Sequence, residues 1–501
     1  MSRRATVLWA LAGLTALGLA VRFASLGLQS YHHDEAITAM RVLPGSFGDM
    51  LHAVRVSESN PPLYYALAWG WVKAFGTDEV GLRSLTALFG AATVPVAYLI
   101  GRQLASWRTG LTLAALVALN PMLIWYSQEA RSYALLVFFG AVSLFFFLRA
   151  LDDRRGRDLA FWALASVLAL CSHYFAVFAV GIEAIWLLVA LRSRWRVVLP
   201  ALAGIGAAGL ALLPLINAQV NPTHIGWIEN SPLSTRVWET AVSFFAGETG
   251  HVIAAAPRDR YALIPLALIG VGLALVALRG ERRERRGAGL GLVLGLGVMG
   301  LAAIAALAGK DYVVERNLLP ALVPLLAAAA IGFSTAGARR LELVLSVALC
   351  AYWLAFDIHV TRTPNLQRPD FRGIVEELGP PLEGRRAIVA WKLAADPVRY
   401  YLRDNAVRVY GGSAWINEIA VLRKPLVTGR PIILPPSFSQ VRRIRADRLT
   451  LNTYVSKIPV KISFPTLDAL PTGYGEDAVL LDGPTSKPPR QPPAPARGAK
   501  Q

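Results

Sequence analysis

The sequence predicts an α-helical polytopic membrane protein with about eleven transmembrane helices and a small α/β domain at its C-terminal end. Of its 501 residues, 54% are hydrophobic and 17% are charged, whereas soluble domains are about 25% charged. Long apolar runs recur as far as residue 356, and shorter strand-like and helix-like segments follow. These features exclude a soluble globular enzyme and a disordered basic protein.

The apolar runs set the predicted spans, because a transmembrane helix needs about 20 mostly apolar residues. The first run is long and lacks a small-residue cleavage site, so we interpret it as a retained helix rather than a signal peptide. The run at 159–172 is the shortest. The eleven candidates cover residues 6–28, 82–101, 109–125, 134–149, 159–172, 174–191, 197–216, 261–278, 288–308, 318–337 and 341–356.

Arginines collect in alternate connections between these spans. If the N-terminus is cytoplasmic, the short inner stretches hold 18 arginines against five acidic residues, and the longer outer loops hold ten basic against thirteen acidic residues. Lys and Arg are enriched in cytoplasmic loops. The sequence therefore predicts an inner or plasma membrane protein with its N-terminus inside and its C-terminal domain outside. Its net charge of +18 reflects topology and a basic outer domain, rather than nucleic-acid binding.

Three outer segments are long enough to carry a site. The first outer loop, 29–81, includes an amphipathic stretch at 63–75 that is typical of a helix lying in the membrane interface. The second is 217–260, and the third is everything after Asp357.

The third segment changes from long apolar runs to alternating short elements, which indicates an α/β domain. Helices are predicted at 371–378 and 396–402, and strands at 387–391, 407–410 and 431–434. The predicted domains are therefore a membrane domain over 1–357, an extracytoplasmic α/β domain over 358–482 and a disordered, Pro-rich basic tail over 483–501.

An acidic pair follows the first span directly. Asp34 and Glu35 come after His32-His33 at the start of the first outer loop. A carboxylate there can act as a general base or a metal ligand, or it can stabilise the first turn of a helix. Asp34 is the better candidate base, because an aspartate at a helix start is held rigidly at the water–lipid boundary. Adjacent histidines rarely point the same way, so shaping the site is favoured over metal binding for them.

Two further clusters lie on the outer side. Glu58 and Asn60 precede Pro61-Pro62, a step that excludes helix before it and presents both side chains outward. Arg131 lies between two spans, and its guanidinium matches a pair of phosphate oxygens. The alternative for Arg131 is a salt bridge to Glu129 or to an acid of the first loop.

The remaining outer polar groups lie at helix ends. His173 and Tyr174 occupy a helix hairpin, and Lys310 and Arg316 form a cation pair suited to an anionic lipid headgroup. Glu183 lies inside an apolar run, where an acid is a functional candidate.

Taken in order, these motifs resemble those of bacterial glycosyltransferase family 39, which is related to protein O-mannosyltransferases and aminoarabinose transferases. The resemblance covers about residues 15–330, and Arg368-Pro369-Asp370-Phe371-Arg372 with the strand–helix run after it also resembles the extracytoplasmic domain of many such proteins. The resemblance implies the GT-C membrane fold. Where relatives often have an aromatic residue before the acidic pair, this chain has His32-His33. The matching motifs are Arg22, Leu26-Gly27, Gln29-Ser30, Asp34-Glu35, Asn60 to Tyr65, Gln128 to Tyr133, His173-Tyr174, and Arg316 with Leu319-Pro320.

The resemblance implies a polyprenyl-phosphate sugar donor, carrying mannose or another hexose or pentose, and an acceptor hydroxyl on a protein, lipid or glycan. Asp34 would deprotonate the acceptor, and a single displacement would invert the anomeric centre. Glu35 and Glu58 would hold the sugar, orient Asp34 or help to bind a divalent cation such as Mg²⁺ or Mn²⁺. Arg131, Arg316, Lys310 and Tyr133 are the candidate donor-phosphate residues, and Glu58, Asn60, Tyr64, His173 and Tyr174 the candidate substrate residues.

The alternative function is a multipass transporter or flippase for a lipid-linked or anionic solute. Such a protein is expected to place charged groups near mid-membrane and to repeat in two halves. Here the polar groups gather at the outer ends of the predicted spans, Glu183 excepted, and no halves repeat. A scaffold that only anchors its C-terminal domain would not need eleven spans. The sequence therefore favours a membrane enzyme.

Overall fold

The computed structural model divides the chain into two compact units. The helical unit comprises Met1–Gln29 and Thr38–Gln367, and the C-terminal unit comprises Ser30–Ile37 and Arg368–Gln501. The structure describes residues 2–153, 155–220, 228, 231–247, 258–335, 339–382, 384–403, 406–424, 430–446, 449–473 and 476–483. The predicted tail, apart from Gly483, and parts of the 217–260 loop lie outside the described residues.

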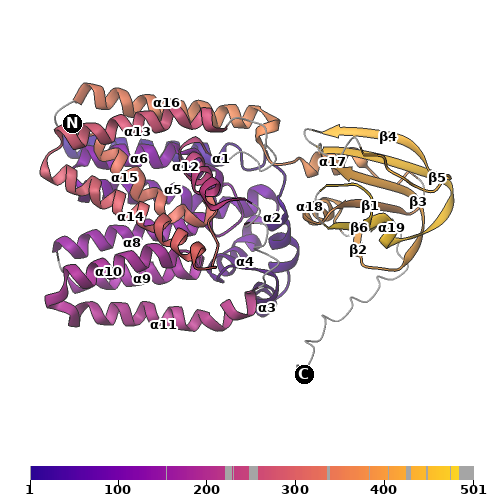
Figure 1. Cartoon of the computed structure of the whole chain (residues 1–501), viewed down its shortest axis with the longest axis horizontal. Helices are drawn as coiled ribbons and strands as arrows, with labels where there is room; N and C mark the ends of the chain where they lie inside the picture. The colour runs from indigo at the N-terminus through magenta and orange to yellow at the C-terminus, as the bar shows by residue number, and fades with distance from the viewer. Residues whose placement is uncertain are drawn as a thin grey trace. The chain divides into compact units, whose positions relative to one another are not determined.

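The helical unit has a helix at each of the eleven predicted places. In Figure 1 the long helices run side by side, with α3 and α4 at one end of the bundle and the N-terminus at the other. The helices are α1 (Arg3–Phe23), η1 (Thr38–Val42), α3 (Phe47–Ser57), α4 (Leu63–Phe75), α5 (Glu79–Leu104), α6 (Trp107–Leu119), α7 (Pro121–Ser127), α8 (Tyr133–Asp153), α9 (Gly156–Ser172), α10 (Ala176–Ala190), η2 (Arg192–Arg194), α11 (Trp195–Gln219), α12 (Leu233–Ala246), α13 (Arg258–Arg279), α14 (Arg282–Leu307), η5 (Glu315–Ala321), α15 (Leu322–Gly332), α16 (Arg339–Arg362) and η6 (Pro364–Leu366).

Eight of these helical segments are long and apolar enough to cross a membrane, or nine if the bent pair α6–α7 forms one span. The pair bends by 56° at Asn120, whose side chain accepts a hydrogen bond from the backbone of Leu123 and so begins a new helix. The other two predicted spans are shorter helices, with 17 residues in α9 and 15 in α10. The first helix ends at Phe23 rather than at residue 28.

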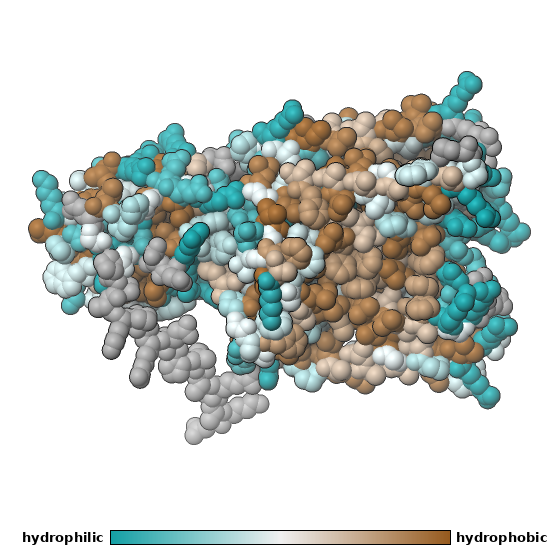
Figure 2. Space-filling view, turned by 180° about the vertical axis from the view of Figure 1, so that it is seen from behind, coloured by the Kyte–Doolittle hydropathy of each residue, from teal (hydrophilic) through white to brown (hydrophobic). Residues whose placement is uncertain are grey.

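The predicted inner segments gather at one end of the helical unit. Gln103, at the end of α5, donates to Asp152 of α8 and accepts from Arg283 of α14. Arg3, in the first turn of α1, lies over the ring of Trp107, which begins α6. Figure 2 shows hydrophobic residues over the middle of this unit and hydrophilic residues gathered at its far end. These segments of α1, α5, α6, α8 and α14 therefore share one end of the helical unit.

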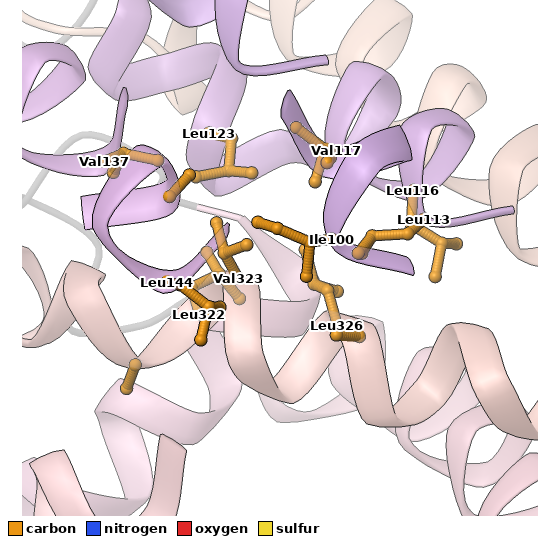
Figure 3. Close-up of a cluster of buried hydrophobic side chains, with 14 of the residues drawn as sticks. Ile100, Leu113, Leu116, Val117, Leu123, Val137, Leu144, Leu322, Val323 and Leu326 are labelled. Carbon is orange, nitrogen blue, oxygen red and sulfur yellow. The ribbon is translucent and has the colours of Figure 1, made fainter. Parts of the chain in front are cut away.

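The core of the helical unit joins α5, α6, α7, α8 and α15. Figure 3 shows aliphatic side chains from these helices converging in one cluster; among the labelled residues are Ile100, Leu113, Leu123, Leu144 and Leu326. Close packing is possible because small residues lie where α5 meets α6. A Cβ atom on Gly101 would come within 2.7 Å of the Thr109 carbonyl oxygen and 2.9 Å of the Gly110 Cα.

Gly101→Ala is therefore expected to destabilise the helical unit by about 1–3 kcal/mol, since backbone atoms must move to admit the methyl group. The control is Gly204→Ala in α11, where nothing lies within 4 Å of the new Cβ. Alanine exceeds glycine in helix propensity by about 1 kcal/mol, so the control should be neutral or stabilising. Thermal unfolding in detergent tests both variants, and equal midpoints would contradict the assigned close packing.

The C-terminal unit is an α/β domain, as predicted. Its six strands have the order β2-β6-β1-β3-β5-β4, with β1 and β3 parallel and every other pair antiparallel. Helices α17 and α18 contribute to the core on one face of the sheet, and α19 contributes to the core on the other. The elements are α2 (His33–Ile37), α17 (Phe371–Leu378), β1 (Arg386–Trp391), α18 (Lys392–Leu402), β2 (Ala406–Val409), β3 (Ser413–Arg423), β4 (Ser439–Ala446), β5 (Leu449–Ser463), α19 (Phe464–Asp468) and β6 (Asp477–Asp482).

The predicted strand at 431–434 is wrong, because these residues, all described, form no strand. Proline cannot donate to a strand ladder, and this run begins with Pro431 and is followed by Pro435-Pro436.

The domain boundary also differs from the predicted one. Helix α16 continues to Arg362, and the C-terminal unit begins at Arg368 and takes in Ser30–Ile37 from the first outer loop.

Candidate active site

The candidate residues of the helical unit come from the helix ends opposite its arginine-rich end. Arg131 lies between α7 and α8, Tyr133 begins α8, and His173 and Tyr174 lie between α9 and α10. Arg316 lies in η5. Further candidates precede or begin α4: Glu58, Asn60 and Tyr64.

Arg131 is held by the first outer loop. Its Nη1 lies 2.7 Å from Oε2 of Glu58 and 3.3 Å from the hydroxyl of Thr38. The phenol of Tyr65 donates to the same Glu58 oxygen at 2.6 Å, and burial raises the pKa of Tyr65 well above its ordinary value, so this donor keeps its proton. The predicted salt bridge to an acid of the first loop is thus present, with Glu58 as partner. It fixes the guanidinium between Glu58 and Thr38.

The charges of Arg131 and Arg316 both act on the imidazole of His173. It is 3% exposed, and its ring lies 5.5 Å from that of Tyr133. Burial, together with the charges of Arg131 and Arg316, lowers the pKa of His173 to about 3. Both guanidiniums therefore act on one place, and the imidazole there stays neutral. Arg316 is half-buried, whereas Lys310 is exposed, so Arg131 and Arg316 are the better pair for a desolvated phosphate.

His173 should make stability depend on pH. Because its folded pKa is about 3 against an ordinary 6.5, the unfolded chain binds a proton between these values that the folded chain excludes. Stability is therefore lost as pH falls through this window, by about 2 kcal/mol at pH 5. The measurement is thermal unfolding in detergent at pH 7.5 and pH 5, for the wild type and His173→Gln. The variant should lose less stability; an equal loss in both would contradict the assignment.

Gln219, at the end of α11, was not predicted from the sequence and organises the neighbouring residues. Its side-chain amide donates to the backbone carbonyls of Val54 and Asn60, and its side-chain oxygen accepts from the phenol of Tyr174 at 2.7 Å. Tyr174 therefore acts through Gln219 on the segment that carries Glu58. A polar residue ending a long apolar run is the only sequence signal for this role.

An ion pair that was not predicted orders the segment before η5. Arg236 of α12 donates to both carboxylate oxygens of Asp311 and, at 2.9 Å, to the carbonyl of Val313. The hydrogen bonds from Arg236 lower the pKa of Asp311. The pairing of Asp311 could not be predicted from the sequence, because nothing local indicates a partner 75 positions away.

The acidic pair belongs to the C-terminal unit. Asp34 is half-buried in α2, and Glu35 is fully buried with its Oε2 3.1 Å from Nη1 of Arg368. The same Glu35 oxygen accepts from the backbone N–H of His32 at 3.1 Å. Glu35 is thus a structural anchor in this unit, and Asp34 is the pair's more accessible carboxylate.

Glu183 of α10 is buried and hydrogen-bonded to two side chains. Glu183 Oε2 accepts from Ser143 at 2.6 Å and from the indole of Trp162 at 2.8 Å.

Within the part of the chain that the structure describes, no three His, Cys, Asp or Glu side chains are grouped to hold a metal ion. Glu35 and Glu58, the carboxylates considered for Mg²⁺ or Mn²⁺, are each paired with an arginine, so they do not fit a cation site.

Comparison with known proteins adds the family context. The dolichyl-phosphate-mannose-protein mannosyltransferase family model matches residues 59–216. The apo crystal structure of ArnT from Cupriavidus metallidurans superposes with a TM-score of 0.59 at 12% identity, covering 90% of this chain and 98% of that one. The chain has the GT-C fold. The GT-C fold implied by the motif resemblance is therefore confirmed, and the family model adds sequence similarity over residues 59–216.

Two further relatives of this GT-C protein are informative. ArnT from the same organism, bound to undecaprenyl phosphate, superposes with a TM-score of 0.56 at 13% identity, again covering 90% of this chain and 98% of that one. An uncharacterized protein of Aquifex aeolicus (strain VF5) is 26% identical over 168 residues, which span 33% of each chain. The chain thus matches about a third of the length of that curated relative.

Proposed function

We propose that this GT-C protein transfers a sugar from a polyprenyl-phosphate donor to an acceptor hydroxyl on the outer face of the membrane. The observation that carries the proposal is the buried guanidinium of Arg131, held 2.7 Å from Oε2 of Glu58 at the helix ends where Arg316 and the buried His173 also lie. The charges of Arg131 and Arg316 both lower the pKa of His173, and two cations that act on one place suit the phosphate of a departing lipid. The ArnT complex with undecaprenyl phosphate supports a donor of the same chemical class.

The reaction assigns one role to each charged group. Asp34 takes the proton from the acceptor hydroxyl, whose oxygen attacks the anomeric carbon. The bond from that carbon to the phosphate oxygen breaks, and its electron pair leaves with the lipid phosphate. Arg131 and Arg316 stabilise the charge that develops there, with Lys310 and Tyr133 as secondary contacts. Phosphate is a good leaving group, so the reaction needs one base and no separate general acid.

The remaining candidates shape the site. Glu58 holds Arg131 through its salt bridge, and Tyr174 holds the segment around Asn60 through Gln219. Tyr64 packs against Tyr65 with ring centroids 5.2 Å apart, and it lines the sugar site together with Asn60. Attack opposite the phosphate inverts the anomeric centre, unlike the two-carboxylate retaining scheme of hydrolases. The N-terminus is cytoplasmic, and the acceptor is a glycan, lipid or protein outside the membrane.

The test is a donor panel. Purified full-length protein is incubated with polyprenyl phosphates carrying mannose, other hexoses or pentoses, and release of the lipid phosphate is measured with and without added acceptors. Release with at least one donor, together with inverted stereochemistry in the product, is expected. In proteoliposomes, movement of intact donor across the bilayer without release would contradict the proposal and favour the transporter.

A further inference from the structure

The segment Ser30–Ile37 belongs to the C-terminal unit although both of its neighbours in sequence belong to the helical unit. Just before it, Arg83 of α5 donates to the carbonyls of Leu26 and Gln29 at 2.8 and 2.7 Å. Just after it, Thr38 is bonded to Arg131. The eight residues of this segment therefore belong to the C-terminal unit. The residues that flank them are held within the helical unit, Gln29 by Arg83 and Thr38 by the candidate phosphate ligand Arg131.

The start of this segment is held by α17 and α18. The Ser30 hydroxyl donates to the carbonyl of Pro369 at 2.9 Å and accepts from the backbone N–H of Phe371 at 3.0 Å. The backbone N–H of Tyr31 donates to the phenol of Tyr401 at 2.7 Å, and the Tyr31 ring packs edge-on against that of Tyr400. Tyr31 is fully buried, so this end of the segment is part of the unit's folded structure.

The residues on either side of Asp34 are held by charged partners. His33 Nδ1 lies 3.3 Å from Oδ2 of Asp396, which is 2% exposed. Glu35 is paired with Arg368, and the two side chains are 0% and 7% exposed. Successive side chains of a helix project about 100° apart. Fixing both neighbours therefore fixes the backbone and the direction of Asp34 between them.

We propose that Arg368, Asp396 and Tyr401 are positioning residues for the base Asp34, so that the C-terminal unit holds the acidic segment in its productive conformation. This inference rests on the proposed function. A buried ion pair adds little net stability relative to an apolar contact, but its geometry is specific. Placing one against Glu35 therefore suits a role in orientation.

The test combines hydrogen exchange with kinetics on the full-length protein in nanodiscs. Tyr401→Phe removes one hydroxyl and Arg368→Gln removes the partner of Glu35. In both variants the amides of residues 30–37 should exchange at least about tenfold faster, because the segment opens more often. The matched control is Lys392→Gln, which removes the exposed Lys392–Glu476 ion pair of the same unit and should change neither exchange nor turnover.

The kinetic result separates positioning from general destabilisation. With the donor that the panel identifies, Arg368→Gln should lower kcat about 10- to 100-fold and leave the donor KM within about twofold, since a displaced base slows chemistry rather than donor binding. Arg368→Lys should restore part of kcat, because it keeps the charge but loses the planar geometry.

Each outcome decides a separate question. Unchanged exchange at residues 30–37 in both variants would overturn the inference, and so would faster exchange with unchanged kcat. An inactive wild type would refute the proposed function instead, because the exchange result does not depend on turnover.

Discussion

Asp34→Asn is expected to lower kcat by about 10²- to 10⁴-fold, which is the usual contribution of a general base. The amide has nearly the shape of the carboxylate but cannot accept the acceptor's proton, so folding and donor binding should be unchanged. The measurement is release of lipid phosphate under single-turnover conditions, together with donor affinity for the same preparation. Retained affinity with lost turnover would assign Asp34 to the chemical step.

The matched control for this prediction is Asp49→Asn in the same outer loop. Asp49 belongs to the capping box that begins α3, and its carboxylate accepts hydrogen bonds from Ser46. It is exposed and takes no part in the proposed reaction, so kcat should stay within about twofold of the wild type. Substantial turnover by Asp34→Asn, with Asp49→Asn equally active, would remove Asp34 as the base.

Arg131→Ala should have the second largest effect, because it lowers both the affinity for the donor and the free energy of unfolding. Loss of a hydrogen bond to a charged group costs about 1.5–3 kcal/mol, so donor affinity should fall about 10- to 100-fold. The variant also leaves the carboxylate of Glu58, 5% exposed, without its guanidinium. Breaking a buried pair by removing one partner costs about 3–5 kcal/mol, which thermal unfolding in detergent would detect.

A double variant separates these two effects. Arg131→Gln combined with Glu58→Gln removes both charges and should recover most of the lost stability, since no unpaired charge stays buried. Donor affinity should stay low, because the phosphate still lacks its guanidinium. If the double variant binds the donor as the wild type does, Arg131 is only a structural partner of Glu58.

The helices of the helical unit could be predicted from the sequence, because each depends on the length and apolar character of its own segment. Apolar runs of sufficient length must form helices in a bilayer, and each of the eleven runs is a helix in the structure. The interfacial stretch at 63–75 is α4 with the same bounds. In the C-terminal unit, α17 has the bounds predicted for it, whereas β4 was not predicted. Its exposed residues include Arg442, Arg443 and Arg445, a pattern typical of an edge strand protected by charge.

The sequence predicted which residues form the candidate site, but not the hydrogen bonds and ion pairs that hold them. Glu58, Arg131 and His173 were identified because charged or polar residues at the ends of apolar runs stand out. The bond from Tyr65 to Glu58 and the role of Gln219 were not predicted, since an ordinary tyrosine or glutamine becomes important only through contacts made in three dimensions. The assignment of Ser30–Ile37 to the C-terminal unit could not be read from any local pattern, because it depends on residues beyond 367.

The pairing of Glu35 with Arg368 spans 333 positions, which sets an order of events during biosynthesis. Domains fold as they emerge, N-terminal parts first, so the helices of the membrane bundle are made before Arg368 leaves the ribosome. A nascent chain that ends at Gln367 already contains Asp34, Arg131 and Arg316, yet it lacks Arg368, Asp396 and Tyr401. Asp34 and its neighbours in the first outer loop therefore acquire these three partners only after the helices of the bundle have been made.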